Sequence, residues 1–268
     1  MSEVDFTIVT INYNNYAGLV KTMHSVQRTL NQHVEWVVVD GGSVDGSVEL
    51  ISKEKNISRY ISEPDHGIYD AMNKGVKLAN GKYIIFMNSG DAFHWQFDFE
   101  LLPTSLDQDS VIYGDCVRNV GDIYYLDRVK DKGASWWLDG TPCHQSIFLP
   151  RQFLLDHPFS LQYKFYADAE NMIRAFTVLP NHIKVPLAIS IYEIGGISSA
   201  AVSSFTSFKR KNQELALAYG RAWKPFSKKF ISGFFKHCLL ILLGVNRYYI
   251  ASYAIKAFIR ARDEKDSI

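Results

Sequence analysis

The chain has 268 residues, of which 47% are hydrophobic, 14% aromatic and 21% charged. This composition is typical of a folded globular protein and excludes a disordered or fibrous chain. The length suits one large α/β domain with an appendage, because single hydrophobic cores stop growing at about 250 to 300 residues.

The net charge of +1 hides an asymmetry along the chain. Residues 208–268 hold 13 Lys and Arg against four Asp and Glu, so this segment carries +9 and residues 1–207 carry −8. We therefore predict a body, 1–207, and a basic tail, 208–268, with different partners. The three cysteines form no CxxC pair, which argues against a disulfide framework or a zinc site. The N-terminus lacks the pattern of a secretory signal, so we expect a cytoplasmic protein.

Residues 1–95 alternate between strand and helix patterns. Short apolar runs predict strands over 6–11, 35–40, 59–63 and 82–87. Helical spacing of apolar residues predicts helices over 16–30, 47–55 and 68–79. This β-α-β order predicts a mainly parallel, Rossmann-like sheet flanked by helices.

The alternation weakens in residues 96–207. Strand patterns recur at 110–113, 123–126, 146–149 and 188–192, and helical spacing recurs at 167–176. We interpret this segment as a second half attached to the same sheet.

Polar residues follow each predicted strand of the first half. They are Asn12 to Asn15, Asp40 with Asp45, Glu63 to Gly67, and Asn88 to Asp91. In open parallel sheets, ligands bind at the carboxyl ends of the strands, so these loops predict a nucleotide site.

Two of these loops carry carboxylates with specific chemistry. Asp40 can accept hydrogen bonds from a base edge or a ribose, whereas Asp45 can equally cap the next helix. Asp91 can supply an oxygen ligand to a hard cation that bridges a diphosphate, or it can serve an ordinary turn.

Together these stretches resemble the nucleotide-binding half of the family 2 glycosyltransferases. The matching pieces are TINYN at 10–14, VDGGSVDG at 39–46, SEPDHGIYDAMNKG at 62–75 and NGKYIIFMNSGD at 80–91. The third piece resembles the subgroup that builds bacterial exopolysaccharides such as colanic acid. The resemblance implies the GT-A fold and transfer of a sugar, with inversion, from a UDP- or GDP-sugar to an acceptor bound by residues 96–207.

The resemblance also implies a set of donor-binding residues, with Asp40 at the base. This set is Thr10, Asn12, Asn14, Asp40, Ser43, Asp65, His66, Gly67, Asn73, Asn88, Ser89 and Gly90. Residues 88–91 stand at the DXD position of the family, where the first acid is replaced by Asn88. We expect Asp91, the remaining carboxylate, to bind Mn²⁺ or Mg²⁺ together with the diphosphate.

An inverting transfer needs a base that takes the proton of the acceptor hydroxyl. The order of residues in FYADAENMIR, 165–174, resembles the acidic motif of the family, which implies Asp168 as the base and Glu170 as second choice. The alternative is that Asp168 only caps the following helix.

Two further segments are candidates for the acceptor side. His144 and Gln145 resemble a His-Gln segment of the family near the acceptor, although a buried histidine with satisfied hydrogen bonds is the alternative. Gly195 and Gly196 are typical of a mobile flap or of an ordinary glycine turn.

The tail interleaves Lys and Arg with Phe, Leu, Ile and Tyr. Its longest mostly apolar stretch, 230–245, has 16 residues and contains Lys236, whereas a membrane span needs about 20. We predict basic amphipathic helices on the inner face of the cytoplasmic membrane, where the enzyme meets a lipid-linked saccharide acceptor. Packing of these helices on the body or in a dimer is the alternative, and no nucleic-acid-binding motif is present.

The sequence thus predicts a metal-dependent glycosyltransferase. Replacement of an acid by Asn88 leaves a second hypothesis, a nucleotide-sugar-binding protein whose catalysis has lapsed. A nucleotidyltransferase is disfavoured because no glycine-rich basic loop for a triphosphate is found.

Overall fold

The computed structural model describes residues 4–103, 108–121, 123–131, 135–138, 141–194 and 205–220, with Cys238, Tyr248 and Ser252 as isolated positions. The chain divides into two compact units. Unit 1 comprises residues 1–117 and 126–192, and unit 2 comprises residues 118–125 and 193–268.

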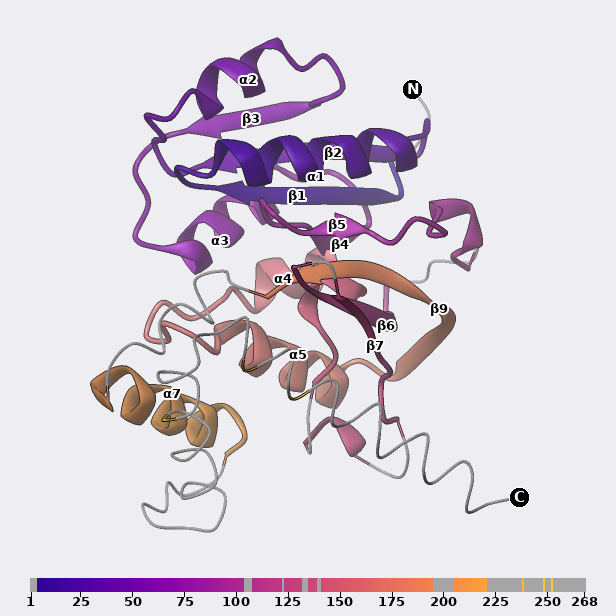
Figure 1. The fold of residues 1–268 in the computed structure, drawn as a ribbon. Coiled ribbons are helices and arrows are strands. Elements are labelled where there is room, and N and C mark those ends of the chain that lie inside the picture. The colour runs from indigo at the N-terminus through magenta and orange to yellow at the C-terminus, as the bar shows by residue number, and fades with distance from the viewer. Residues whose placement is uncertain are drawn as a thin grey trace. The chain divides into compact units, whose positions relative to one another are not determined.

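Helices and strands alternate through the first half of the chain (Figure 1). In chain order the elements are β1 (Phe6–Asn12), α1 (Tyr16–Thr29), β2 (Val34–Asp40), α2 (Ser47–Lys53), β3 (Arg59–Ser62), α3 (Ile68–Leu78), β4 (Tyr83–Phe86), β5 (Ala92–Phe93), β6 (Ser110–Val120), β7 (Ile123–Asp127), β8 (Ile147–Pro150), α4 (Arg151–Asp156), α5 (Ala167–Val178), β9 (Asn181–Glu193) and α7 (Phe205–Ala218). Short 3₁₀ helices lie at Phe99–Leu101, Trp136–Leu138 and His144–Ser146.

The predicted α/β fold class is confirmed. The strand order is β3-β2-β1-β4-β8-β6-β9-β5, and β7 pairs with β6. Strands β3, β2, β1 and β4 run parallel, whereas β8 pairs antiparallel with both β4 and β6. The carboxyl ends of the four parallel strands therefore share one edge of the sheet, where the polar loops were predicted to meet.

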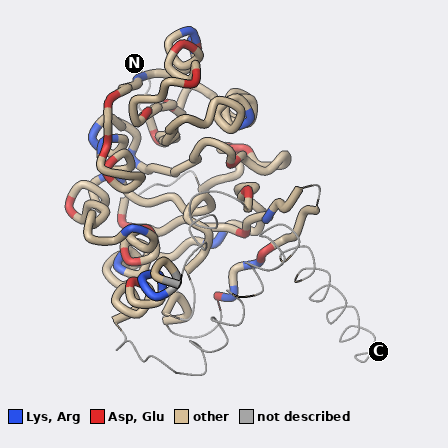
Figure 2. The backbone as a smooth tube through the Cα atoms, turned by 60° about the vertical axis from the view of Figure 1, so that its left-hand side comes forward, with Lys and Arg blue, Asp and Glu red and all other residues tan. Residues whose placement is uncertain are grey.

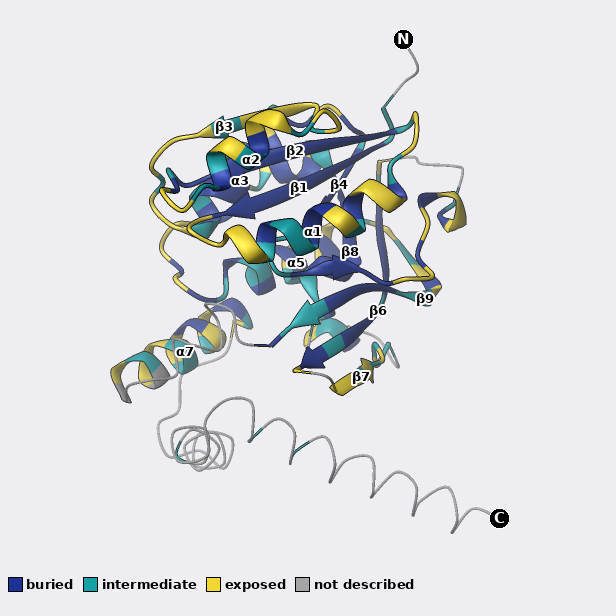
Figure 3. Cartoon of the chain, turned by 45° about the horizontal axis from the view of Figure 1, so that its top comes forward, coloured by how far each residue is buried: buried dark blue, intermediate teal, exposed yellow. Residues whose placement is uncertain are grey.

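Helices cover both faces of the parallel strands. Ile8, Trp36 and Val38 belong to the same buried cluster as Leu19 and Met23 of α1. Neighbouring strand residues point to the opposite face, and there Gly75 of α3 packs against Val9 and Val39. Figure 3 shows buried central strands and exposed outer faces on the helices.

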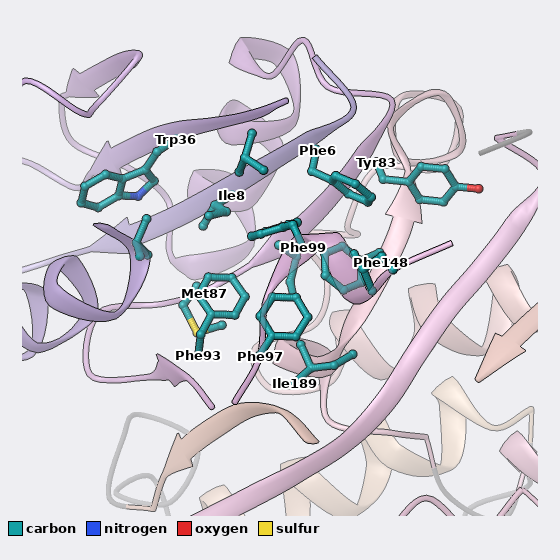
Figure 4. Packing of buried hydrophobic residues seen from close by; sticks show 14 of the residues in the cluster. Phe6, Ile8, Trp36, Tyr83, Met87, Phe93, Phe97, Phe99, Phe148 and Ile189 are labelled. Carbon is teal, nitrogen blue, oxygen red and sulfur yellow. The ribbon is translucent and has the colours of Figure 1, made fainter. Parts of the chain in front are cut away.

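Aromatic side chains fill the core where the sheet continues past β4. The ring of Phe6 packs against Tyr83, Phe99 and Phe148, with centroids 5.2 to 6.3 Å apart (Figure 4). Phe93 stacks on Phe97 at 5.0 Å. The core thus extends from β1 across the chain that follows β4, which joins the two predicted halves of the body.

In residues 96–207, the lengths of two strands and the number of helices differ from the prediction. Strands β6 and β9 are longer than predicted because polar residues interrupt their apolar pattern, and α4 was missed because six residues are too few to show a helical period.

The predicted basic tail begins within α7, where Arg210 donates to Glu214 at 2.7 Å. The rest of the tail beyond residue 220 lies outside the described residues, apart from the three isolated positions. In the part of the chain that the structure describes, no helix has both the length and the apolar character needed to cross a membrane. Figure 2 shows basic and acidic positions interspersed along the described backbone.

Close packing of α3 on the sheet predicts the effect of one substitution. A Cβ atom at Gly75 would overlap Cγ1 of Val9, which is fully buried and has a stiff β-branched side chain. We expect Gly75→Ala to lower the free energy of unfolding by about 1–3 kcal/mol, although helix propensity alone would raise it by about 1 kcal/mol. Urea unfolding measures the change, and Lys77→Ala on the exposed side of the same helix is the control. Increased stability of Gly75→Ala would contradict this account of the packing.

Candidate active site

Asp40 holds together the loops at the ends of β1, β2 and β3. Its carboxylate is fully buried and accepts five hydrogen bonds. The donors are Asn12 Nδ2 at 2.8 Å, Gly42 N at 3.1 Å, Ser43 N at 2.8 Å, Ser43 Oγ at 2.6 Å and Ser62 Oγ at 2.8 Å. Burial raises the pKa of Asp40, but the hydrogen bonds from Ser43, Asn12 and Ser62 outweigh it and lower the pKa below its usual value.

Neighbouring predicted donor-binding residues also bond to one another. Ser43 Oγ accepts from Asn14 N at 2.7 Å, and Asn14 Oδ1 accepts from Val44 N at 2.9 Å. Thr10 is buried and accepts from Trp36 Nε1 at 3.0 Å. These side chains shape the loop, and their contact with a donor stays a prediction.

Asp45 accepts hydrogen bonds from the first residues of two helices. Its carboxylate accepts from Ser47 N at 3.1 Å at the start of α2 and from Tyr16 N at 2.8 Å at the start of α1. Asp45 thus accepts from the first N–H of both helices, although the N-cap positions are Gly46 for α2 and Asn15 for α1.

The loop between β3 and α3 is held by Lys74. Its ammonium group lies 2.8 Å from Glu63 Oε1 and donates to Pro64 O at 3.0 Å. Asp65 Oδ1 accepts from Gly67 N at 2.8 Å, and the backbone N–H of His66 donates to Asp70 at 3.1 Å. These bonds tie the loop to the first two turns of α3.

Asn73 joins α3 to the segment that precedes α5. Its amide donates to Phe159 O and accepts from Phe159 N, both at 2.9 Å. Both ends of the side chain are therefore engaged, and its predicted contact with the donor stays a prediction.

The turn at 88–91 is anchored to α1. Thr22 Oγ1 donates to Asp91 O at 2.6 Å, and Asn15 Nδ2 donates to Ser89 O at 3.0 Å. Gly90 takes a φ of 108°, which is left-handed and favours glycine. Within the described part of the chain, the buried Ser89 Oγ has no hydrogen-bond partner.

The structure brings Asp168 and His144 together. Asp168 Oδ2 lies 3.0 Å from His144 Nδ1, and Asp168 Oδ1 accepts from Tyr69 OH at 3.0 Å. Both side chains of the ion pair are 21% exposed. Helix α5 begins at Ala167 after Tyr166, so Asp168 lies inside the first turn and not at the capping position.

Burial and the neighbouring charge shift the pKa values of His144 and Asp168 in opposite directions. Burial lowers the pKa of His144, but the hydrogen bond and charge of Asp168 outweigh it and raise the pKa to about 9. Burial raises the pKa of Asp168, but His144 and then Tyr69 lower it below its usual value. At neutral pH the pair is an imidazolium and a carboxylate.

The protonation of His144 decides how Asn88 points. Asn88 Nδ2 faces His144 Nε2 at 3.3 Å, while the buried Asn88 Oδ1 has no partner among the described residues. An imidazolium donates from both ring nitrogens, so interchange of the amide N and O lets Asn88 accept from His144, and the amide N–H groups then face the position that has no partner among the described residues. His144 then donates to Asp168 on one side and to Asn88 on the other.

Gln145 makes a parallel link to the same turn. Its Nε2 donates to Asp91 Oδ2 at 2.7 Å, and its Oε1 accepts from Cys143 Sγ at 2.7 Å. The His-Gln segment thus contacts both ends of the 88–91 turn. Glu170, by contrast, pairs with Arg174 on the surface of α5.

Asp91 is the candidate metal ligand, and it is 6% exposed. Among the described residues, no group of three or more His, Cys, Asp and Glu side chains could hold a metal ion. The residues present fit a cation held mainly by phosphate oxygens, because Mg²⁺ commonly binds through one or two carboxylates plus substrate phosphates.

The predicted flap and two tyrosines remain to be placed. Gly195 and Gly196, the predicted flap, lie outside the described residues. Tyr69 and Tyr13 were not singled out from the sequence. Tyr69 lies inside the motif at 62–75, but its partner Asp168 is 99 residues away. Tyr13 is 62% exposed beside the polar loops, an unusual position for a large aromatic ring.

Residues 7–169 match the sequence profile of the family described as Glycosyl transferase family 2. The chain belongs to this family. It is a glycosyltransferase, as predicted.

Individual relatives agree with this assignment. The chain is 29% identical over 213 residues to a PGL/p-HBAD biosynthesis glycosyltransferase of Mycobacterium tuberculosis, covering 74% of this chain and 80% of the relative. S. aureus TarS 1–349 in complex with UDP-GlcNAc superposes with a TM-score of 0.62 at 15% identity, covering 88% of this chain and 73% of that chain. The mannosyltransferase PcManGT from Pyrobaculum calidifontis, in complex with GDP-Man and Mn²⁺, superposes with a TM-score of 0.57 at 14% identity, covering 96% and 76%. These two structures support the GT-A fold.

The ion pair predicts a pH dependence of stability. The folded pKa of His144, about 9, lies above its ordinary value of 6.5, so its contribution is complete below pH 6.5 and is lost as the pH rises through 9. The contribution of Asp168 is lost only in acid, as the pH falls through its lowered pKa. We expect the stability difference between wild type and His144→Gln to shrink by roughly 3 kcal/mol between pH 6.5 and 9.

Urea unfolding at a series of pH values measures this difference. His24→Gln, at an exposed position of α1, is the control and should follow the wild-type pH profile. A stability difference for His144→Gln that is constant over this range would contradict the assignment of the imidazolium.

Proposed function

We propose that this enzyme transfers a sugar, with inversion, from a UDP- or GDP-sugar to a saccharide acceptor carried on a lipid diphosphate. Asp168 acts as the base, and a divalent cation accompanies the diphosphate. The complexes of TarS with UDP-GlcNAc and of PcManGT with GDP-Man support a nucleotide-sugar donor.

The observation that carries this proposal is the link between Asp168 and the turn at 88–91. His144 contacts Asp168 at 3.0 Å and Asn88 at 3.3 Å, and Gln145 contacts Asp91 at 2.7 Å. A base and a diphosphate-binding turn must lie on opposite sides of the anomeric carbon in an inverting reaction. Two adjacent residues that bridge them provide such a spacing.

The proposed reaction requires one proton transfer and one substitution. The acceptor hydroxyl oxygen attacks the anomeric carbon while Asp168 takes its proton, and the bond from that carbon to the diphosphate oxygen breaks with its electron pair leaving on the diphosphate. Each carboxylate oxygen of Asp168 already accepts one hydrogen bond and has a further lone pair for the hydroxyl.

His144 has two roles in this scheme. Its positive charge keeps Asp168 ionised, and it brings a cation to the turn where the diphosphate is expected. The acid that Asn88 replaces would accept from His144 as a second anion, whereas the neutral amide accepts without adding negative charge beside the leaving group.

The metal would be held by Asp91 and the oxygens of the diphosphate. When bound, the cation supplies positive charge that stabilises the leaving diphosphate. Mn²⁺ in the complex of PcManGT supports this proposal.

We place the enzyme at the inner face of the cytoplasmic membrane. Residues 208–268 carry +9 and intersperse their basic residues with aromatic and aliphatic ones, a composition that suits an anionic lipid surface. A lipid-linked acceptor of exopolysaccharide assembly would be presented at such a surface.

Substitution of the base tests the mechanism. Asp168→Asn keeps the side-chain shape but removes the proton acceptor, so we expect kcat/KM for transfer to fall by about 10²- to 10⁴-fold. Glu170→Gln, two residues away and paired with Arg174, should change it less than about threefold. The assay measures transfer from a panel of UDP- and GDP-sugars to a lipid-diphosphate-linked saccharide and to the free saccharide.

Each arm of this assay has an outcome that contradicts one part of the proposal. A larger loss of kcat/KM in Glu170→Gln than in Asp168→Asn would indicate that Glu170 is the base. Equal use of the free saccharide would remove the lipid carrier from the proposal. Binding of a donor without any transfer would favour the lapsed-enzyme hypothesis.

Removal of the metal tests the cation separately. We expect chelation by EDTA to lower the transfer rate by about 10²-fold or more, with recovery on addition of Mn²⁺ or Mg²⁺. Asp91→Asn should raise the Mn²⁺ concentration needed for half-maximal rate, because a carboxylate ligand is lost. Full activity in EDTA would show that the protein's own charges suffice.

A further inference from the structure

The loops after β2 and β3 meet at Gly41. A Cβ atom at this position would lie 2.6 Å from Asp65 Oδ2 and 3.1 Å from Cδ2 of Tyr13. Both distances are too short for ordinary contact, so the carboxylate and the aromatic ring occupy the space that any other residue at position 41 would fill. Gly41, Asp65 and Tyr13 thus form one cluster at the carboxyl edge of the parallel strands.

Asp40 is poorly placed to recognise a ligand here. Its two oxygens accept five hydrogen bonds from Asn12, Gly42, Ser43 and Ser62, and its side chain is fully buried. A carboxylate offers about four lone-pair sites, so none is left for a nucleotide.

Asp65 has the opposite character. It is partly exposed, and one oxygen, Oδ1, accepts from Gly67 N at 2.8 Å. Its Oδ2 accepts no hydrogen bond from the described residues and is the oxygen that lies beside Gly41. The ties of Lys74 to Glu63 and Pro64 hold the loop that presents this oxygen.

We propose that Asp65 accepts a hydrogen bond from the base of the donor nucleotide, that this base stacks on Tyr13, and that Gly41 leaves the space that both side chains occupy. This proposal rests on the proposed function and assigns to Asp65 the base contact that the sequence predicted for Asp40. An ionised carboxylate only accepts hydrogen bonds. Uracil and guanine present a ring N–H on their pairing edge, whereas cytosine and adenine present a bare ring nitrogen there.

The site therefore selects uridine or guanosine diphosphates against cytidine and adenosine diphosphates. A bare ring nitrogen opposite Asp65 would leave two acceptors facing each other, and unpaired polar groups of this kind give strong discrimination. The exposed ring of Tyr13 offers a face on which a base can stack.

Calorimetric titration of the full chain with UDP, GDP, CDP and ADP, in the presence of Mn²⁺, tests the proposal. Wild type should bind UDP or GDP at least about tenfold more tightly than CDP and ADP. Asp65→Asn, whose amide both donates and accepts, should reduce this ratio to about threefold or less, and Gly41→Ala should do the same by displacing the carboxylate. Glu49→Gln is the control, because it neutralises an exposed carboxylate of α2 that lies outside the loop of Asp65 and should keep the ratio.

The outcomes separate this proposal from the proposed function. Failure of wild type to bind any of the four nucleotides would overturn the proposed function itself. Binding by wild type with an unchanged ratio in Asp65→Asn would overturn only the role of Asp65, as would equal weakening of all four nucleotides, which would indicate contact with the ribose. Thermal melts of each variant verify folding, and Asp65→Asn introduces no Cβ clash that could prevent it.

Discussion

A buried carboxylate must be surrounded by hydrogen-bond donors, and this requirement at Asp40 organises the loops at the carboxyl ends of β1, β2 and β3. Asp40 lies at the end of β2, and its donors come from the end of β1, from its own loop and from the end of β3. Parallel pairing in register places Asn12 opposite Asp40 and Asp40 opposite Ser62, so the donors arrive at one point. The loops that carry Tyr13 and Asp65 are fixed relative to each other as a result.

An ion pair links two segments elsewhere in the site. Asp168 belongs to α5 and His144 to the segment before β8, and each favours the charged form of the other. Because His144 also contacts Asn88, the helix that bears the proposed base is coupled to the turn that follows β4. Loss of either partner would leave an uncompensated charge beside the apolar side chains that line this region, among them Phe86 and Met172.

These two networks explain why Asn88 is compatible with an enzyme. The replaced acid would be expected to contribute negative charge for a metal, and here an imidazolium occupies the adjacent position. Positive charge near a leaving diphosphate can come from a metal, from a protein cation or from both. The proposed scheme divides this task between His144 and a cation held by Asp91.

Much of the architecture was predictable from the sequence. Over residues 1–95 the periods of apolar residues are clean, and each predicted element lies within two residues of its observed bounds. Beyond residue 95 the prediction was poorer. Polar residues interrupt the apolar pattern of β6 and β9, so the full length of these strands depends on their pairing with neighbouring strands. Asp168, His144, Gln145 and Asn88 were each singled out by residue type and motif.

The sequence by itself determined the fold class, the family and the chemically capable residues, because these follow from local periodicity and from motifs of adjacent residues. Only the tertiary structure decided which of these residues are partners. Tyr69, His144 and Asp168 come from three separate segments, and nothing local to any of them indicates the other two. The same holds for the contrast between Asp40 and Asp65, since the number of donors around a carboxylate depends on segments that only folding brings together.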